Sequence, residues 1–176
     1  QVRQSCSALI DDLLKDSSVI ELKPMSKFPV VRDLFVDRAR LFEDLKKVKG
    51  WVPIDGMYDL GPGPTETPET QEVRYDLSRC MSCGCCLEVC PQYTKDNHFV
   101  GAAVISQVRY FNQHKTGAEL KGERLDEMAS DGGIADCGNA QNCVKVCPKD
   151  IPLTESIADV GRQTTWHVIK SFFTGK

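Results

Sequence analysis

Nine cysteines constrain this 176-residue chain more than any other feature, because eight of them fall in two short runs. The first run holds Cys80, Cys83, Cys85, Cys86 and Cys90, and the second holds Cys137, Cys143 and Cys147. Cys6 lies outside both. Secreted scaffolds built on disulfides are shorter and richer in cysteine, at roughly 8–10% of residues or more. An odd number of tightly clustered cysteines in a chain this long indicates thiolate ligation of a metal in a reducing compartment.

The spacing of the first run is typical of bacterial ferredoxins: Cys80-x2-Cys83-x2-Cys86-x3-Cys90-Pro91. In such a run, three thiolates hold one cubane iron-sulfur cluster and the fourth reaches a second cluster. The two-residue spacers let a tight turn point successive sulfurs at adjacent irons, whereas the longer spacer turns Cys90 towards the other cluster. Gly84 supports this turn because glycine adopts backbone conformations that other residues avoid.

The second run repeats the first at an offset of 57 residues, with one exception. Positions 80, 86, 90 and 91 match Cys137, Cys143, Cys147 and Pro148. The position opposite Cys83 is Ala140, whose methyl group cannot coordinate iron. Interleaved ligation then assigns a full set of four thiolates to a [4Fe-4S] cluster, from Cys80, Cys83, Cys86 and Cys147. The other site receives three, from Cys90, Cys137 and Cys143, which favours a [3Fe-4S] cluster unless solvent or a nearby residue supplies a fourth ligand.

Two other uses of the cysteines are less favoured. Cys80 and Cys83 alone would pass for half of a four-thiolate zinc site, but zinc sites do not require three-residue spacers followed by proline. Disulfides fit the clustering less well still. Cys85 lies outside the 57-residue register, opposite Asn142, and we interpret it as a small buried side chain beside a cluster, not as an iron ligand.

Outside the cysteine runs, the sequence shows no substrate chemistry of its own. The three histidines, His98, His114 and His167, have no paired metal spacing. We find no Ser/His/Asp arrangement, phosphate-binding glycine loop or nucleotide fingerprint. The 22 basic residues are matched by 25 acidic ones with no basic half, which argues against nucleic acid as a partner. No apolar run approaches the roughly 18 residues of a membrane span, and no cleavable leader is visible.

Apolar periodicity predicts a mainly helical chain. Helices are expected over 33–48, with Asp33 as a possible N-cap, and over 100–114 and 119–129. The segments before and between them are expected to be irregular. Residues 19–23 alternate like a brief strand, and the proline- and glycine-rich residues 50–70 predict a structured loop or a hinge.

A last helix is expected to run towards Phe173, with Thr154 as its cap. Trp166, Ile169 and Phe173 form a stripe along it. Core packing and contact with a membrane anchor explain this stripe equally well. At the other end, the chain opens on Gln1 with a cysteine soon after, and we expect the sequence to be a fragment of something longer.

Three segments carry a resemblance to a known family: Phe28-Pro29-Val30-Val31-Arg32-Asp33-Leu34, Cys80-Met81-Ser82-Cys83-Gly84-Cys85-Cys86 and Asn142-Cys143-Val144-Lys145-Val146-Cys147-Pro148-Lys149. They resemble the iron-sulfur subunit of succinate dehydrogenase and fumarate reductase, the family of respiratory complex II. The resemblance covers nearly the whole chain, and the cysteine spacing with its single gap is highly specific. It implies the same [4Fe-4S] and [3Fe-4S] ligand sets as the repeat.

The resemblance also implies the domain organisation. It predicts that residues 1–27 are the C-terminal remnant of a plant-type [2Fe-2S] ferredoxin domain and that residues 28–176 form a helical, bacterial-ferredoxin-like domain with two cubane-type clusters. A loop or linker is expected at about 50–72. Cys6 looks like the last ligand of the [2Fe-2S] cluster, whose other three ligands lie outside this sequence. The sequence would then lack most of the N-terminal ferredoxin domain.

The function implied by the resemblance is electron transfer in a membrane-bound succinate:quinone oxidoreductase. The chain would be a non-catalytic subunit that passes electrons from an FAD flavoprotein to a haem-bearing cytochrome b anchor and quinone, as a peripheral protein on the cytoplasmic face of the bacterial membrane. Alternatives are a fumarate reductase subunit working in reverse and a free ferredoxin-like carrier.

Two positions depart from ubiquinone-linked members of the family. Those usually carry a tryptophan four residues past Pro91 and a histidine directly after the first cysteine of the second run. Here these positions are Lys95 and Gly138, although the quinone-adjacent Pro91 itself is retained. The departures resemble menaquinone-linked bacterial members.

Overall fold

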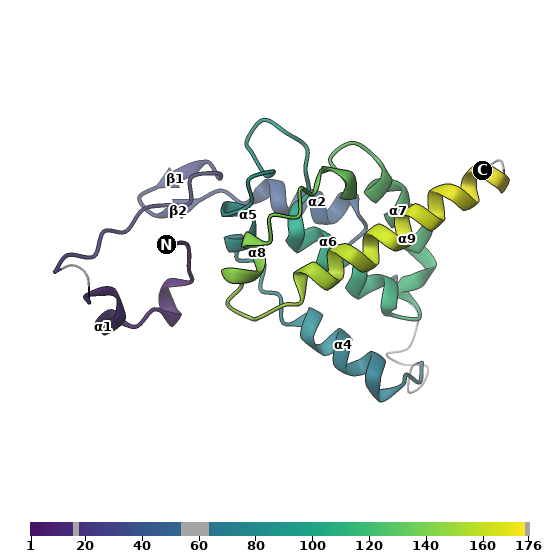
Figure 1. Cartoon of the computed structure of the whole chain (residues 1–176), viewed down its shortest axis with the longest axis horizontal. Helices are drawn as coiled ribbons and strands as arrows, with labels where there is room; N and C mark the ends of the chain where they lie inside the picture. The colour runs from purple at the N-terminus through teal and green to yellow at the C-terminus, as the bar shows by residue number, and fades with distance from the viewer. Residues whose placement is uncertain (16–17, 54–63, 175–176) are drawn as a thin grey trace.

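In the computed structural model, residues 1–15, 18–53 and 64–174 are described, and they form a mainly helical protein with one two-stranded sheet. The longer helices are α2 (Ala39–Lys47), α4 (Pro68–Ser78), α6 (Gly101–Gln113), α7 (Lys121–Ala129) and α9 (Leu153–Thr174). The shorter ones are α1 (Ile10–Leu13), α5 (Cys85–Glu88), α8 (Asn142–Lys145) and the 3-10 turns η1 (Ser5–Ser7), η2 (Gly117–Leu120) and η3 (Ile134–Asp136). Figure 1 shows the N-terminal segment and the sheet at one end of the molecule and the end of α9 at the other.

Helix α6 is the centre of the core. Its residues 101–106 are all buried, and it packs against α2, α4, α5, α7 and α9. Such a helix must be apolar or small on every side, and α6 meets this requirement with the run Gly101-Ala102-Ala103-Val104-Ile105. The predicted helices over 100–114 and 119–129 are therefore confirmed, the second as α7 preceded by η2.

The predicted helix over 33–48 is shorter than expected. Strands β1 (Val30–Arg32) and β2 (Phe35–Val36) pair antiparallel, with Asp33 in the turn between them at a φ of 51°. Asp33 therefore does not cap the helix. The carboxylate of Asp37 accepts a hydrogen bond of 2.8 Å from the backbone N–H of Ala39, where α2 begins. The β-branched and aromatic residues of this stretch suit a hairpin better than a helix.

Two further expectations need correction. Residues 19–23 form no strand, and α4 begins at Pro68, inside the segment expected to be a loop. Proline is favoured in the first turn of a helix, and the hydroxyl of Thr67 caps α4 by accepting a hydrogen bond of 3.3 Å from the N–H of Thr70. The rest of the predicted loop includes residues 54–63, which lie outside the described residues.

The buried guanidinium of Arg124 ties the segment after α2 to the core. It donates hydrogen bonds to the carbonyl oxygens of Lys49, Trp51 and Gly117 and to Oδ1 of Asn112, at 2.6–3.1 Å. Burial lowers the pKa of Arg124. A buried cation is tolerated when its donors are satisfied in this way.

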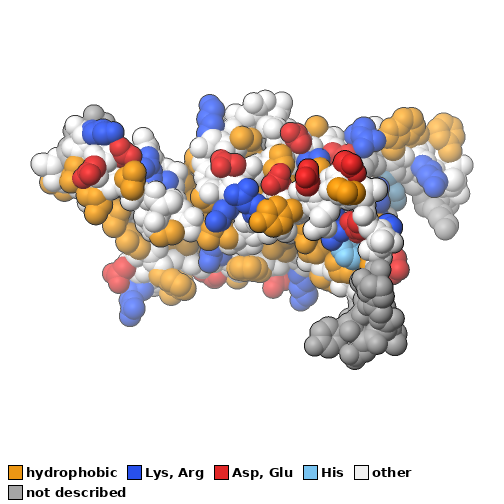
Figure 2. All heavy atoms as spheres, turned by 90° about the horizontal axis from the view of Figure 1, so that it is seen from below, with side chains coloured by type: hydrophobic (Ala, Val, Ile, Leu, Met, Phe, Trp, Pro, Cys, Tyr) orange, Lys and Arg blue, Asp and Glu red, His pale blue; other side chains and the backbone are white. Residues whose placement is uncertain are grey.

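The last helix begins at Leu153, so Thr154 lies in its first turn and is not its cap. The end of α9 is exposed, with Trp166 64%, Ile169 42% and Phe173 81% accessible. The stripe of Trp166, Ile169 and Phe173 therefore does not pack into the core of this chain. Apolar side chains are visible at this end of the molecule in Figure 2. None of the described helices is long and apolar enough to cross a membrane.

Candidate metal centres

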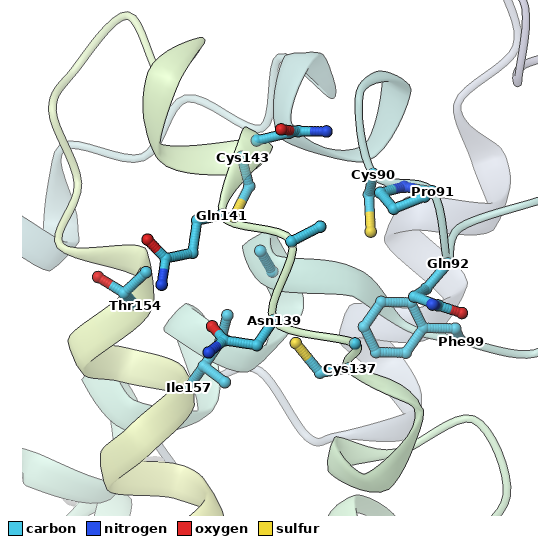
Figure 3. A pocket seen from close by; sticks show the side chains of 14 residues that line it. Cys90, Pro91, Gln92, Phe99, Cys137, Asn139, Gln141, Cys143, Thr154 and Ile157 are labelled. Carbon is cyan, nitrogen blue, oxygen red and sulfur yellow. The ribbon is translucent and has the colours of Figure 1, made fainter.

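The cysteines of the two predicted ligand sets line two separate cavities. The four-cysteine cavity is lined by Cys80, Cys83, Cys86 and Cys147. The three-cysteine cavity, shown in Figure 3, is lined by Cys90, Cys137 and Cys143. Their empty volumes are similar, about 380 and 400 Å³ with the open mouths included. Each cavity thus takes cysteines from both runs, as interleaved ligation requires.

The two cysteine turns have the same backbone conformation at the 57-residue offset. Helices α5 and α8 begin and end at matching positions. Ser82 and Asn139 both have a φ of 51°, and Gly84 and Gln141 both have left-handed backbones. The hydrogen bond from the N–H of residue 87 to the carbonyl of residue 84 recurs between residues 144 and 141, and the 90-to-87 and 93-to-90 bonds recur likewise. The 57-residue repeat is therefore present in the backbone conformation as well as in the sequence.

Ala140 occupies the position of Cys83 in the second turn and lines the three-cysteine cavity. No carboxylate, histidine or fourth cysteine lines this cavity among the residues that the structure describes. Its remaining polar lining comes from Asn139, Gln141, Asn142, Thr154 and Gln92. The donor set fits a three-iron cluster, because one corner lacks a thiolate.

Two adjacent small residues of α6 line one cavity each. Ala102 lines the three-cysteine cavity, and Ala103 lines the four-cysteine cavity. Their small side chains leave room for a cluster on each side. Because α6 begins at Gly101 and the positive end of a helix dipole lies at its N-terminus, this wall also favours an anionic group. Neither alanine was predicted from the sequence, although a small-residue run at the start of a helix could have indicated both.

Burial favours the protonated form of three of the cavity thiols. It raises the pKa of Cys80 and Cys143, and it raises that of Cys86 well above the usual range. The charges of Cys80, Cys83 and Cys147 raise the pKa of Cys86 further, which reflects their closeness around one cavity. Iron must therefore displace protons from these sulfurs when it binds. Cluster binding is coupled in this way to the release of protons.

The arrangement suits clusters better than single ions. In the part of the chain that the structure describes, no group of three or more His, Cys, Asp or Glu side chains is arranged to hold one metal ion. Both cysteine sets instead surround a volume, whereas the thiolates of a zinc site converge on one atom. The cavities and the donor chemistry fit [4Fe-4S] and [3Fe-4S] groups.

Two cysteines line neither cavity. Cys85 is 1% exposed, and burial followed by the neighbouring Cys83 raises its pKa to about 12. Cys6 is exposed in η1. Their predicted roles, as a buried thiol and as a [2Fe-2S] ligand, stay predictions.

The predicted quinone-adjacent residue Pro91 lines the three-cysteine cavity, next to Gln92 (Figure 3). A Cβ at Gly138 would lie 2.7 Å from Nε2 of Gln92. A larger residue at position 138 would therefore require Gln92 to move. The side chain of Gln92 takes the space beside Gly138.

Comparison with known proteins places this geometry in a family. Residues 76–151 match the model of a 4Fe-4S dicluster domain, and residues 1–43 match that of a 2Fe-2S iron-sulfur cluster binding domain. The succinate dehydrogenase iron-sulfur subunit of Bacillus subtilis is 57% identical over 97% of this chain. The chain belongs to the family of succinate dehydrogenase and fumarate reductase iron-sulfur subunits. It spans 66% of the length of the Bacillus subtilis relative.

More distant members agree with this family assignment. The fumarate reductase iron-sulfur subunit of Wolinella succinogenes is 29% identical over 90% of this chain and 66% of its own length. A chain of the Mycobacterium smegmatis Sdh1 complex in the apo form matches with a TM-score of 0.66, covering 80% of this chain and 59% of that chain. At 22% identity, this likeness concerns the fold alone.

Proposed function

We propose that this chain is the electron-transfer subunit of a membrane-bound succinate:quinone oxidoreductase. The observation that carries the proposal is the division of seven cysteines into a four-cysteine cavity, lined also by Ala103, and a three-cysteine cavity, lined also by Ala102. The clusters, when bound, supply reversible one-electron transfer. The residues of this chain would hold them.

The proposed [4Fe-4S] ligands are Cys80, Cys83, Cys86 and Cys147, and the proposed [3Fe-4S] ligands are Cys90, Cys137 and Cys143. The crossing of the two runs supports a short path between the sites, because each run contributes to both. Cys143 also lies close enough to Cys86 for its charge to raise the pKa of that thiol. Electrons would thus pass between the two proposed cluster sites within this subunit, without a mobile carrier.

The third cluster, [2Fe-2S], would be held in part by Cys6 in the intact subunit. We assign residues 1–27 to the end of that ferredoxin domain and residues 28–176 to the dicluster domain, with a linker at about 50–72. The match of residues 1–43 to a 2Fe-2S domain model supports a ferredoxin portion at this end of the chain.

The partners follow from the family. We propose an FAD flavoprotein that oxidises succinate, a haem-bearing cytochrome b anchor, and quinone near Pro91, with menaquinone favoured by Lys95 and Gly138. The subunit itself would bind no substrate and would lie on the cytoplasmic face of the membrane. The second candidate is fumarate reduction through the same clusters, supported by the fumarate reductase relatives.

Low-temperature EPR of the intact complex, with iron and sulfide counts, tests this proposal. We expect an oxidised three-iron signal and a reduced four-iron signal that respond to succinate. Purification of the chain as a free carrier, without a flavoprotein or a haem-containing anchor, would contradict it.

A further inference from the structure

The N-terminal segment lies across the first cysteine turn. Phe28 is 2% exposed, and its ring lies 3.1 Å from the point where a Cβ of Gly84 would stand. Gly84 has a φ of +86°, so it both forms the turn and leaves room for the ring. The approach of Phe28 brings the preceding residues, Ser26 and Lys27, close to α5.

Glu88, at the end of α5, holds this segment in place. Its carboxylate accepts hydrogen bonds from the N–H of Ser26 at 2.8 Å, the hydroxyl of Ser26 at 2.7 Å and the N–H of Lys27 at 3.1 Å. Burial raises the pKa of Glu88, but these bonds and the charge of Lys27 outweigh burial, so that the pKa is lowered overall. Glu88 is a charged acceptor, and it therefore fixes the two consecutive residues Ser26 and Lys27.

The Lys27 side chain then reaches over the end of the turn. Its Nζ donates to the carbonyl oxygen of Cys90 and lies 3.4 Å from that of Leu87. These carbonyls belong to the stretch that joins Cys86, in the four-cysteine cavity, to Cys90, in the three-cysteine cavity. A partly buried ammonium group is thus held on the backbone of Cys90, a proposed ligand of the three-iron site, and near the backbone of Leu87, which follows the proposed four-iron ligand Cys86.

We propose that Lys27 is a redox-tuning residue whose fixed positive charge raises the reduction potential of the cluster held by Cys90, and that Glu88 is the residue that positions it. The inference rests on the proposed function, since it needs a cluster at the three-cysteine cavity. Reduction adds negative charge to a cluster, and a nearby cation stabilises the reduced state more than the oxidised one. Partial burial keeps this interaction from being fully screened.

The test is a redox titration of the three-iron EPR signal in the intact complex. Lys27→Gln keeps a donor for the carbonyl oxygens and removes the charge, whereas Lys27→Met removes both. We expect both variants to lower the midpoint potential. At a fixed potential the ratio of oxidised to reduced cluster should rise by about three- to tenfold, where tenfold corresponds to 59 mV for a one-electron couple. Lys27→Arg should remain close to the wild type.

Lys23→Gln is the matched control. It removes the same charge from the same segment, but Lys23 is 73% exposed and pairs with Glu21. An unchanged potential in Lys27→Gln, an equal shift in Lys23→Gln, or an equal shift in Lys27→Arg would overturn the inference. If Lys27→Met fails to assemble its clusters, Lys27→Gln still decides between charge and hydrogen bonding. Absence of the three-iron signal from the wild-type complex would instead count against the proposed function.

Discussion

Cys83 and Ala140 occupy equivalent positions in two turns of the same backbone conformation. The residue before each of them has a φ of 51°, and the residue after each has a left-handed backbone. Ala140 already lines the three-cysteine cavity. A side chain at position 140 therefore leaves the backbone in the same way as the proposed ligand Cys83.

Ala140→Cys should convert the three-iron site to a [4Fe-4S] site. Only the side chain has to change, because the turn is already formed. The added thiolate should also lower the reduction potential and slow electron delivery to quinone. EPR checks this: the oxidised three-iron signal should disappear and a second reduced four-iron signal should appear. A persistent three-iron signal beside a free thiol at position 140 would reopen the assignment of Cys90, Cys137 and Cys143.

The α6 wall predicts that each cluster can be removed separately. Ala103→Leu should fill the four-cysteine cavity and lower the amount of [4Fe-4S], whereas Ala102→Leu should act on the three-cysteine cavity. Both alanines are at most 5% exposed, so the added atoms cannot turn to solvent. EPR spin counts with iron analysis measure the effect. Ala129→Leu, at an exposed position on α7, is the control, and equal loss of both clusters in either wall variant would refute site selectivity.

The cysteine grouping could be predicted from sequence because a repeat of fixed offset and a proline-terminated spacer are local information. Each cavity is lined by the set of cysteines that the repeat assigns to one cluster. The hairpin at Val30–Val36 and the contact of Glu88 with Ser26 and Lys27 could not be predicted in this way. Each depends on residues about 60 positions apart or on competition between strand and helix, which periodicity does not encode.

Cys85 and Cys86 are neighbours with different predicted roles. Cys86 lines the four-cysteine cavity, whereas Cys85 does not. Cys85→Ser should leave the iron content and the cluster spectra nearly intact, and Cys86→Ser should damage the four-iron cluster. Iron and sulfide analysis with EPR distinguishes the two. The reverse result would mean that the register is shifted by one residue.

Arg124 should contribute strongly to stability because it is completely buried and donates to three backbone carbonyls. Arg124→Met would leave those carbonyls without their partner, and we expect a loss of about 3 kcal/mol in the free energy of unfolding. Thermal unfolding of the intact subunit and hydrogen exchange at residues 49–51 measure this. Arg162→Met is the control: Arg162 is 67% exposed and pairs with Asp159, so its loss should cost well under 1 kcal/mol. Similar destabilisation by both changes would contradict the argument.

Removing the iron should abolish cooperative folding of the subunit. The two helices that carry the cysteine turns, α5 and α8, have four residues each, far fewer than the roughly 12–15 that make an isolated helix marginally stable. What holds them is the packing around the two cavities, and metal-site formation is coupled to folding when ligands come from distant parts of the chain. Chelation of iron under reducing conditions should therefore remove the single thermal transition, with amide protection lost first at α5 and α8. Circular dichroism and hydrogen exchange follow the process. An iron-free form that keeps its native helix content and unfolds in one cooperative step would show that α6, α7 and α9 specify this fold without the clusters.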